Sequence, residues 1–430
     1  MMKAKVITLG CKVNQYESEA MLSSLLQHGF AAAEDKETAD VVILNSCTVT
    51  AESDRKVRQI FRRAKKDNPD AVMVLTGCMA QAFPEDARRL EEADIILGTS
   101  NRKRLVPDLL AFLSARQRII DIAPHTNDEK FENLNVENFT GRTRAFVKIE
   151  DGCNRFCSYC IIPYARGRVR SKPLEDLKAE LAGLGANGYK EVVLTGINLS
   201  AYGQESGLHL CDAIEAACAT PGIERVRLGS LEPEQLSEDV IRRMAKQEKL
   251  CPQFHLSLQS GCDATLKRMN RHYTADEYRT IVRNLRAAFE NAAITTDIMV
   301  GFAGETDEEF AESLAFAEEI AFAKVHVFAY SRRPGTRAYD MGDQLTNAVK
   351  EARSHEMIRV TTATQQACFK AQIGRTEEVL FEREIQKGVW EGYSMNYTPV
   401  AVASGTSLAG EIRSVRIESC TDTHCMGVVL

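Results

Sequence analysis

Six of the thirteen cysteines in this chain of 430 residues form two sets whose spacing could support metal chemistry. Cys153, Cys157 and Cys160 form a C-x3-C-x2-C pattern inside DGCNRFCSYCIIPYARGRVRS. Three thiolates on one short loop suit three irons of a [4Fe–4S] cluster, whose fourth iron stays open to a small molecule. A structural zinc loop is the alternative. Zinc normally takes four closed ligands in paired C-x2-4-C sets, however, and no second set lies nearby.

The second set, Cys11, Cys47 and Cys78, follows three short apolar runs: KVITLGC, VVILNSC and VMVLTGC. These runs are rich in β-branched residues and have the length of buried parallel strands. Helical stretches, Glu17–His28 and Ser53–Lys66, lie between them, and this alternation predicts a parallel sheet. The carboxyl ends of parallel strands share one edge, so we expect the three thiols to converge there. For any one of them, an ordinary buried cysteine is the alternative.

A second alternating region follows, and it predicts a partial (βα)6 barrel. A closed barrel of eight units typically needs about 250 residues, and this region has fewer. Helices are expected at Leu174–Leu184, Ser237–Glu248, Thr274–Asn291 and Glu305–Ile320. The expected strands are Arg144–Glu150, Glu191–Gly196, Arg225–Gly229, Gln253–Gln259, Thr295–Gly301 and Lys324–Tyr330.

The last sixty or so residues change character, with short alternating runs separated by glycines, which predicts a small antiparallel β-barrel. The chain is therefore expected to be an α/β protein of three domains. Residues 1–125 form the parallel-sheet domain, 126–143 a polar, asparagine-rich linker, 144–370 the partial barrel and 371–430 the terminal β-barrel.

Composition narrows the class of protein. The chain is 44% hydrophobic and 27% charged, which is typical of a folded protein, and its net charge is −6. No apolar run approaches the roughly 18 residues of a membrane span, and the amino terminus has no secretory signal. We therefore expect a cytoplasmic protein without membrane contact. In that compartment cysteines favour metal or redox chemistry over a disulfide scaffold.

The cluster loop resembles the radical S-adenosylmethionine superfamily, whose signature is C-x3-C-x-aromatic-C, with Tyr159 as the aromatic residue. Members use a partial βα barrel. The resemblance implies that S-adenosylmethionine binds the open iron and that the reduced cluster cleaves it to a 5′-deoxyadenosyl radical. An electron donor such as a flavodoxin or ferredoxin is implied as well. The cofactors supply this chemistry, and the protein positions them.

The same resemblance implies further cofactor contacts. Thr195 and Gly196, after the second strand of the barrel, and Gly301, within DIMVGFAGET, resemble stretches near the methionyl and adenine parts of S-adenosylmethionine. Glycine at such points allows close backbone approach. Ser257 and Gln259 are expected near the ribose. Plain turns at strand ends are the alternative for each residue.

The whole chain resembles the methylthiotransferase family. The resemblance rests on a three-cysteine amino-terminal domain, a radical domain containing CIIPYARGRVRS, and a small terminal barrel. It implies a second [4Fe–4S] cluster on Cys11, Cys47 and Cys78, a sulfur donor, and a terminal barrel of the TRAM type, often an RNA-binding module.

The context of the first cysteine, T-L-G-C-K-V-N-Q-Y-E, resembles the branch that acts on threonylcarbamoyladenosine at position 37 of tRNA. Two alternatives within the family act on isopentenyladenosine in tRNA, where G-C-Q-M-N is usual, and on an aspartate of a ribosomal protein, where G-C-x-K-N is usual. An alternative from another class is a zinc-stabilised RNA-binding protein without catalysis.

The partner implied by this branch is the anticodon loop of tRNA, whose unpaired bases can be splayed out. Arg166, Arg168 and Arg170 are the predicted contacts for the substrate carboxylate, because the arginine fork matches a carboxylate. The terminal barrel has five basic against eight acidic residues, which weakens a purely electrostatic role in RNA binding. Three aromatic residues there are candidates for base stacking or for core packing: Trp390, Tyr393 and Tyr397.

Overall fold

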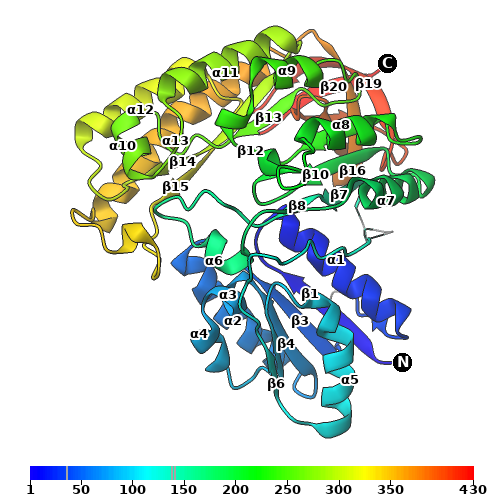
Figure 1. Cartoon of the computed structure of the whole chain (residues 1–430). Coiled ribbons are helices and arrows are strands. Elements are labelled where there is room, and N and C mark those ends of the chain that lie inside the picture. The colour runs from blue at the N-terminus through cyan, green and yellow to red at the C-terminus, as the bar shows by residue number, and fades with distance from the viewer. Residues whose placement is uncertain (35–36, 137–138, 140–141) are drawn as a thin grey trace.

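The structure is a computed structural model that describes residues 1–34, 37–136, 139 and 142–430 (Figure 1). The predicted linker, 126–143, therefore lies partly outside the described residues, at 137–138 and 140–141. Among the described residues, no helix is both long and apolar enough to cross a membrane.

The amino-terminal domain is a parallel sheet flanked by helices, as predicted. In the described part of this domain the sheet has six strands in the order β2-β1-β3-β4-β5-β6. The strands are β1 (Lys3–Thr8), β2 (Ala31–Ala32), β3 (Val41–Ser46), β4 (Val72–Gly77), β5 (Ile95–Leu97) and β6 (Ile119–Asp121). The helices are α1 (Lys12–Gln27), α2 (Ala51–Asp67), α3 (Cys78–Ala82), α4 (Pro84–Arg88) and α5 (Leu105–Ala115), with a 3₁₀ turn η1 (Arg102–Arg104).

The sequence predicted the three central strands and missed the three outer ones. β3 and β4 are buried along their whole length, and such strands give continuous β-branched runs that are easy to recognise. The missed strands have only two or three residues, too few to show a period. α1 also begins five residues before the predicted start, directly after Cys11.

The second domain is an open barrel of parallel strands with helices outside it, which confirms the predicted fold. β10 lies between β7 and β11, and β12, β13, β14 and β15 follow in order. The strands are β7 (Arg144–Lys148), β10 (Glu191–Thr195), β11 (Arg225–Leu228), β12 (Ser230–Leu231), β13 (Gln253–Leu256), β14 (Ala293–Val300) and β15 (Lys324–Ala329), with a short antiparallel pair β8 (Glu150–Asp151) and β9 (Arg170–Ser171). The helices are α6 (Ile162–Arg166), α7 (Leu174–Ala186), α8 (Leu210–Ala219), α9 (Glu238–Met244), α10 (Asp263–Arg268), α11 (Ala275–Ala288), α12 (Asp307–Ile320) and α13 (Asn347–Lys370), with 3₁₀ turns η2 (Leu199–Ala201), η3 (Pro233–Gln235) and η4 (Arg337–Tyr339).

The third strand of this barrel divides at Gly229. Its first part, β11, pairs with β10, and its second part, β12, pairs with β13. The backbone therefore passes from one three-stranded sheet to a four-stranded one at this glycine. Because β11 and β12 follow each other directly, the two sheets continue into each other at this strand, and the six βα units together form the open barrel.

The carboxyl-terminal domain is a closed five-stranded barrel in the order β16-β17-β18-β20-β19. It packs beside β7 and β10 in the upper part of Figure 1. Arg225 and Arg227 of β11 donate to the carbonyl oxygens of Tyr393 and Met395, which fixes this contact. The strands are β16 (Thr376–Gln386), β17 (Val389–Ser394), β18 (Pro399–Ala403), β19 (Ile412–Cys420) and β20 (Cys425–Val429).

Helix α1 joins the first two domains. It lies between the amino-terminal sheet and the second domain in Figure 1. Its Tyr16 is buried in the main hydrophobic core of the second domain, and the Tyr16 hydroxyl donates to Glu180 at 2.9 Å. The same helix carries Glu17, whose side chain is fully buried.

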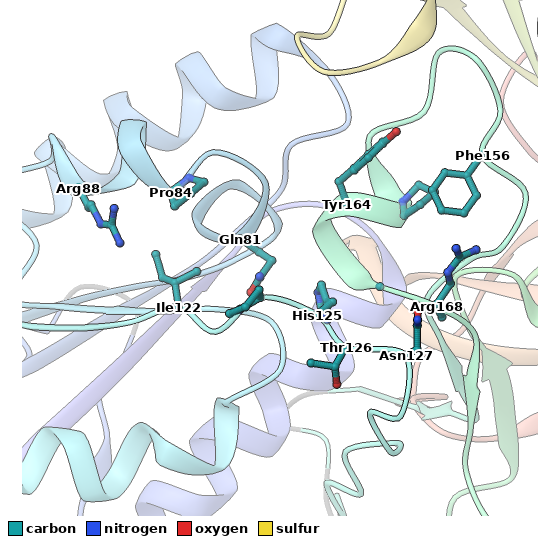
Figure 2. A pocket seen from close by; sticks show the side chains of 13 residues that line it. Gln81, Pro84, Arg88, Ile122, His125, Thr126, Asn127, Phe156, Tyr164 and Arg168 are labelled. Carbon is teal, nitrogen blue, oxygen red and sulfur yellow. The ribbon is translucent and has the colours of Figure 1, made fainter.

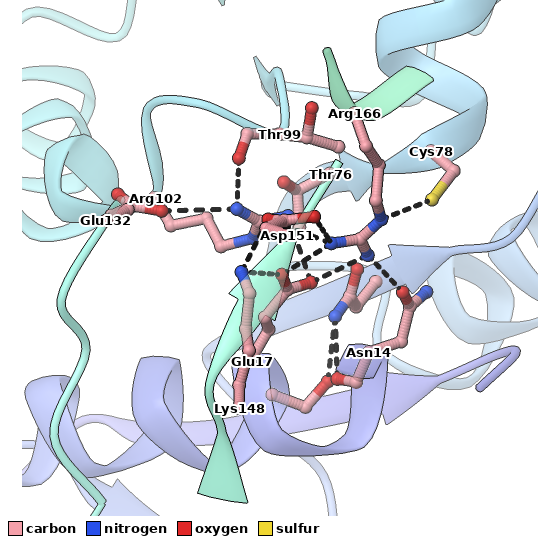
Figure 3. Close-up of polar contacts among 12 residues, drawn as sticks. Asn14, Glu17, Thr76, Cys78, Thr99, Arg102, Glu132, Lys148, Asp151 and Arg166 are labelled. Carbon is pink, nitrogen blue, oxygen red and sulfur yellow. Dashed lines mark hydrogen bonds and ion pairs between the residues drawn. The ribbon is translucent and has the colours of Figure 1, made fainter. Parts of the chain in front are cut away.

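The Glu17 carboxylate meets three cations from both domains (Figure 3). It lies 2.9 Å from Arg102, 2.7 Å from Lys148 and 2.7 Å from Arg166. Burial by itself raises the pKa of Glu17, but these cations outweigh burial and lower the pKa to about 2. Asp151 supplies a second carboxylate to Lys148 and Arg166.

We predict that Glu17→Gln destabilises the protein by about 3 kcal/mol or more, because it leaves buried cations without their counter-ion. The folded pKa of Glu17 lies below the ordinary value of 4.5, so the contribution of its charge is complete above pH 4.5 and is lost as the pH falls toward 2. The measurement is thermal unfolding of the anaerobically purified protein from about pH 2 to pH 8. The exposed Glu52, which pairs with Arg55 on the surface of α2, is the matched control as Glu52→Gln. Equal melting temperatures for wild type and Glu17→Gln at pH 7 would refute the prediction.

Candidate active site

The thiols of Cys11, Cys47 and Cys78 lie together at the carboxyl edge of the amino-terminal sheet. Cys11 directly precedes α1, Cys47 follows β3, and Cys78 begins α3 after β4. β1, β3 and β4 are neighbours in the sheet. Burial raises the pKa of the Cys78 thiol to about 12, and the charges of Cys47 and Cys11 contribute to the increase. The three thiols are thus within electrostatic reach of one another.

Glycines allow two of these cysteines to approach their neighbours. Gly10 has a φ of +107°, and a Cβ there would lie 2.9 Å from the Cβ of Cys47. Gly77 has a φ of +94°, and a Cβ there would lie 2.5 Å from the carbonyl oxygen of Ser46. Both positions therefore require glycine for conformation and for space. The Gly-Cys pairs hold the strand ends close together.

The second set of thiols lies on the loop between β8 and α6. The Cys160 N–H donates to the Cys157 carbonyl at 3.0 Å, and the Phe156 backbone has a φ of +50°. Asn270 holds this turn from outside by donating to the Phe156 carbonyl. Burial raises the pKa of Cys153 to about 12, and the charge of Cys157 adds to it. The three cysteines therefore form a second group of neighbouring thiols.

Each group of thiols has an arginine beside it. The Arg271 guanidinium donates to the Cys157 sulfur at 3.4 Å and pairs with Glu232. The Arg166 guanidinium donates to the Cys78 sulfur at 3.3 Å. A positively charged donor at a sulfur favours the thiolate, which is the form that binds iron. At Cys78 the charge of Arg166 therefore opposes the rise in pKa that burial causes.

A cavity of about 710 Å³ lies between the three domains, and Cys11 lines it. Residues of the barrel strands β10, β11, β13, β14 and β15 form another part of its wall. A loop of the terminal barrel closes a further side. The residues that line it include Lys12, Thr195, Gly196, His255, Asp297, Lys324, His326, Phe328, Tyr393 and Tyr397.

A second cavity of about 200 Å³ adjoins the first, and Cys160 lines it. Asp297 and Phe328 line both cavities, so the two cavities are neighbours that share these side chains. Cys11 of the first thiol group lines one cavity, and Cys160 of the second thiol group lines the other.

Four of the predicted cofactor residues lie on these walls. Thr195 and Gly196 line the large cavity, and Tyr159 and Gln259 line the small one. Gln259 has a left-handed backbone, with a φ of +69°, and its N–H donates to the Asp297 carbonyl at 2.9 Å. A non-glycine residue in this conformation carries strain, which is common at functional sites.

Two other predicted cofactor residues, Ser257 and Gly301, are not among the described residues that line either cavity. The Ser257 carbonyl accepts hydrogen bonds from Arg271 and Tyr273. A Cβ at Gly301 would lie 2.4 Å from Cγ of Lys350, so packing against α13 explains this glycine. Their cofactor contacts stay predictions.

The three predicted substrate arginines do not come together. Arg166 is fully buried and donates to Glu17, Asp151 and Asn14 as well as to Cys78 (Figure 3). It therefore holds the domain interface, and no arm of its guanidinium is free for a substrate. The sequence could not reveal this, because Glu17 lies 149 residues away.

The other two arginines lie outside the cavity. Arg170 is buried and donates to the carbonyl oxygens of Arg166 and Arg168. Arg168 is exposed, lies 4.7 Å from the centre of the Phe156 ring, and lines a separate cleft of about 460 Å³ (Figure 2). Neither is among the residues that line the cavity between the thiol groups. Substrate contact by Arg168 and Arg170 stays a prediction.

Several wall residues that carry charge or can carry it are not among the site residues predicted from the sequence. His255 lies 3.4 Å from Asp297, and the ring of His326 is 6.1 Å from that of His255. Lys12 directly follows Cys11, so its place beside a candidate ligand was a usable signal. The pKa of Lys12 falls to about 8, first through burial and then through repulsion by Arg144 and Arg227.

Two tyrosines of the terminal barrel also reach the cavity. The rings of Tyr393 and Tyr397 stack with centroids 4.6 Å apart and planes 17° apart. Arg144 lies 5.1 Å from both ring centres. Trp390, the third candidate for stacking, instead packs against the barrel core.

Two family descriptions match this chain. Residues 3–98 match an uncharacterized protein family, UPF0004, and residues 147–317 match the radical SAM superfamily. The first match spans β1 to β5 with the first thiol group, and the second contains the second thiol group.

Curated relatives match almost the whole length. The chain is 36% identical to the threonylcarbamoyladenosine tRNA methylthiotransferase MtaB of Bacillus subtilis, over 95% of this chain and 92% of that protein. The protein of the same name from Thermotoga maritima is 37% identical, over 98% and 96%. This chain belongs to the radical S-adenosylmethionine methylthiotransferase family. A tRNA-2-methylthio-N(6)-dimethylallyladenosine synthase of Pelotomaculum thermopropionicum is 34% identical to this methylthiotransferase, over 100% and 98%.

Solved structures agree with the fold. The radical S-adenosylmethionine methyltransferase TsrM from Kitasatospora setae, solved with cobalamin and a [4Fe–4S] cluster, gives a TM-score of 0.57 at 14% identity. The match covers 78% of this chain and 74% of that one. As a radical SAM methylthiotransferase, the protein uses S-adenosylmethionine and [4Fe–4S] clusters, and its two thiol groups fit the clusters by donor type.

We predict that Arg166→Lys lowers stability by about 2 kcal/mol or more, because lysine has no fork to join Glu17, Asp151 and Asn14 at once. Among molecules that fold, KM for tRNA should stay within about twofold of wild type. The measurements are thermal unfolding and steady-state kinetics, with Arg168→Lys as the exposed neighbouring control. Wild-type stability together with a KM raised tenfold or more would restore the substrate role of Arg166.

Proposed function

We propose that this protein is a tRNA methylthiotransferase that converts N6-threonylcarbamoyladenosine at position 37 of tRNA to its 2-methylthio derivative. The observation that carries the proposal is the pair of neighbouring cavities, which share Asp297 and Phe328 and are lined by Cys11 of one thiol group and Cys160 of the other. The substrate class is supported by relatives named for threonylcarbamoyladenosine tRNA, which are 36% and 37% identical over nearly the full length.

We assign one cluster to Cys153, Cys157 and Cys160 and the other to Cys11, Cys47 and Cys78. Each set offers three thiols, and three thiolates leave one iron of a cluster open. Zinc normally gathers four ligands around one ion.

The two cofactors supply radical chemistry at carbon 2 of the adenine and the transfer of sulfur and methyl to it. The chain positions the cofactors and shields them from water. Arg271 and Arg166 hold Cys157 and Cys78 by hydrogen bonds to sulfur. Gln259 and Tyr159 line the space beside Cys160, where S-adenosylmethionine is expected. The cavity walls exclude bulk water from reactive species.

A second substrate, isopentenyladenosine in tRNA, is the alternative within the family. It is favoured by the relative that is 34% identical over 100% of this chain and is named for N(6)-dimethylallyladenosine. The two N6 substituents differ in charge, because the threonylcarbamoyl group carries a carboxylate and the dimethylallyl group does not. Charged residues of the cavity therefore decide between the substrates.

We further propose that the terminal barrel is of the TRAM type and helps to hold the anticodon loop. The stacked pair Tyr393 and Tyr397 supports this, since stacked aromatic rings suit an unpaired base. An electron donor such as a flavodoxin or ferredoxin, a sulfur donor and a cytoplasmic location complete the proposal. Its domains are residues 1–125, 144–370 and 371–430, with 126–143 as the linker.

We predict that Cys157→Ala abolishes reductive cleavage of S-adenosylmethionine, whereas Cys78→Ala leaves it intact and abolishes methylthiolation. Each thiolate holds one iron, so the loss of one removes the cluster that it serves and spares the other. The measurements are 5′-deoxyadenosine and methylthio nucleoside, quantified by mass spectrometry after anaerobic reduction with dithionite. Cys211→Ala, a buried cysteine outside both sets, is the control and should give both products. Wild-type 5′-deoxyadenosine from Cys157→Ala, or normal methylthio product from Cys78→Ala, would overturn the corresponding ligand assignment.

We also predict that the protein modifies an anticodon stem-loop carrying threonylcarbamoyladenosine at least 100-fold faster than one carrying isopentenyladenosine, in kcat/KM. A site that pairs a carboxylate leaves its own cation unpaired when the group is apolar, and such sites discriminate strongly. The two stem-loops must share one sequence, so that only the N6 group differs. A reversed preference would move the protein to the isopentenyladenosine branch.

A further inference from the structure

Binding threonylcarbamoyladenosine in this cavity takes a carboxylate out of water. An unpaired buried carboxylate is costly, so the wall must offer a cation or several hydrogen-bond donors. The arginines expected for this task lie elsewhere: Arg166 is consumed by the interface network, and Arg168 and Arg170 lie outside the cavity wall. The partner of the carboxylate must therefore come from another part of the chain.

Four basic side chains line the cavity. Two of them already contact other side chains, and a third favours its neutral form. The Lys324 ammonium donates to Gln365 at 3.1 Å. His255 contacts Thr295 at 3.1 Å and Asp297 at 3.4 Å. Burial lowers the pKa of His326, which favours its neutral form.

The fourth is Lys12, in the first turn of α1. Among the described residues, its ammonium makes neither a hydrogen bond nor an ion pair. The two arginines whose charges repel Lys12, Arg144 and Arg227, already have acidic partners. Arg144 pairs with Glu382 at 2.5 Å, and Arg227 pairs with Glu191 at 2.8 Å. The first turn of α1 contains no acidic residue. Lys12 is thus an uncommitted cation on the wall beside Cys11.

We propose that Lys12 is the specificity residue that pairs with the carboxylate of the threonylcarbamoyl group, an inference that rests on the proposed function. The charges of the wall favour this pairing. Asp297 is the one acidic residue among the described residues that line the large cavity, and it also lines the small cavity beside Cys160. A carboxylate is repelled by Asp297 and attracted by Lys12.

The pairing also fits the chemistry of the base. Carbon 6, which carries the N6 substituent, and carbon 2 are separated only by N1 of the adenine ring, so the substituent leaves the ring at the edge that also carries carbon 2. Cys11 lines the cavity next to Lys12, and its cluster is the one proposed to serve sulfur transfer. Tyr393 and Tyr397 close the same part of the cavity and offer a flat surface to the ring. Lys12 therefore binds the carboxylate of the N6 substituent beside the cluster from which sulfur is transferred to the ring.

The test is a double-mutant cycle in which one change is made in the protein and the other in the substrate. It uses the full-length, anaerobically reconstituted enzyme. The two substrates are one anticodon stem-loop carrying threonylcarbamoyladenosine and the same stem-loop with that carboxylate converted to a carboxamide. The variants are Lys12→Met, which keeps length but removes charge, and Lys12→Arg, which keeps charge. Lys324→Met is the matched control, since it removes another lysine from the same wall. Methylthio product gives kcat/KM, and iron content with 5′-deoxyadenosine formation reports on both clusters.

Wild type should prefer the carboxylate substrate over the carboxamide by about 10- to 100-fold, the range of one charge-assisted hydrogen bond. In Lys12→Met this preference should fall to about twofold or less, while the rate on the carboxamide stays near that of wild type. Lys12→Arg should keep a preference of at least fivefold, and Lys324→Met should keep the wild-type ratio.

A wild-type enzyme that uses both substrates equally would overturn the inference, whatever the variants do. An undiminished preference in Lys12→Met would overturn it as well. Should Lys12→Met lose iron, the neutral Lys12→Gln replaces it under the same criterion. Failure of the proposed function looks different, because wild type would then form no methylthio product on the threonylcarbamoyladenosine stem-loop at all.

Discussion

The buried carboxylate of Glu17 is the contact on which the arrangement of the domains depends. It lies on the helix that follows Cys11, and its three cations come from η1 of its own domain and from β7 and α6 of the next. All of these side chains are almost or fully withdrawn from solvent. Buried charges tolerate little displacement, because separation from a partner exposes the full cost of desolvation. The interface is therefore set by charge geometry as well as by apolar packing, and the positions of both thiol groups follow from it.

Arg166 transmits this constraint to both candidate cluster sites. Its guanidinium bonds Glu17 and Asp151, and its Nε donates to the Cys78 sulfur. Asp151 lies two residues before Cys153 on the same strand and loop, and Arg166 ends the helix that follows Cys160. One side chain thus touches a ligand of one thiol group and is held by the segment that carries the other. A fixed spacing between the groups is what sequential chemistry on one adenine requires, since the ring cannot travel far between steps.

Features encoded by neighbouring residues could be predicted from the sequence, whereas contacts between residues far apart in the chain could not. The six cysteines, the central strands and the open barrel are encoded locally, in spacing and in β-branched runs, and they were found. β2, β5 and β6 are too short to carry a period. The place of Arg166 was beyond reach for another reason: a buried arginine and a substrate-binding arginine look alike in sequence, and only its partner 149 residues away distinguishes them. Lys12 and Asp297 show the same limit, because their relation exists only across the folded cavity.

The contacts of the terminal barrel suggest a different role in RNA binding from the one that its charge composition suggests. With five basic and eight acidic residues it is a poor electrostatic partner for RNA by itself. Its Tyr397 adopts a left-handed backbone, with a φ of +68°, and stacks on Tyr393 at the cavity wall. The positive charge beside these rings belongs to the second domain, since Arg144 lies on β7 and Arg227 on β11. The barrel therefore contributes flat apolar surface, and the positive charge beside that surface comes from the neighbouring domain, so that this part of the cavity wall exists only where the domains meet.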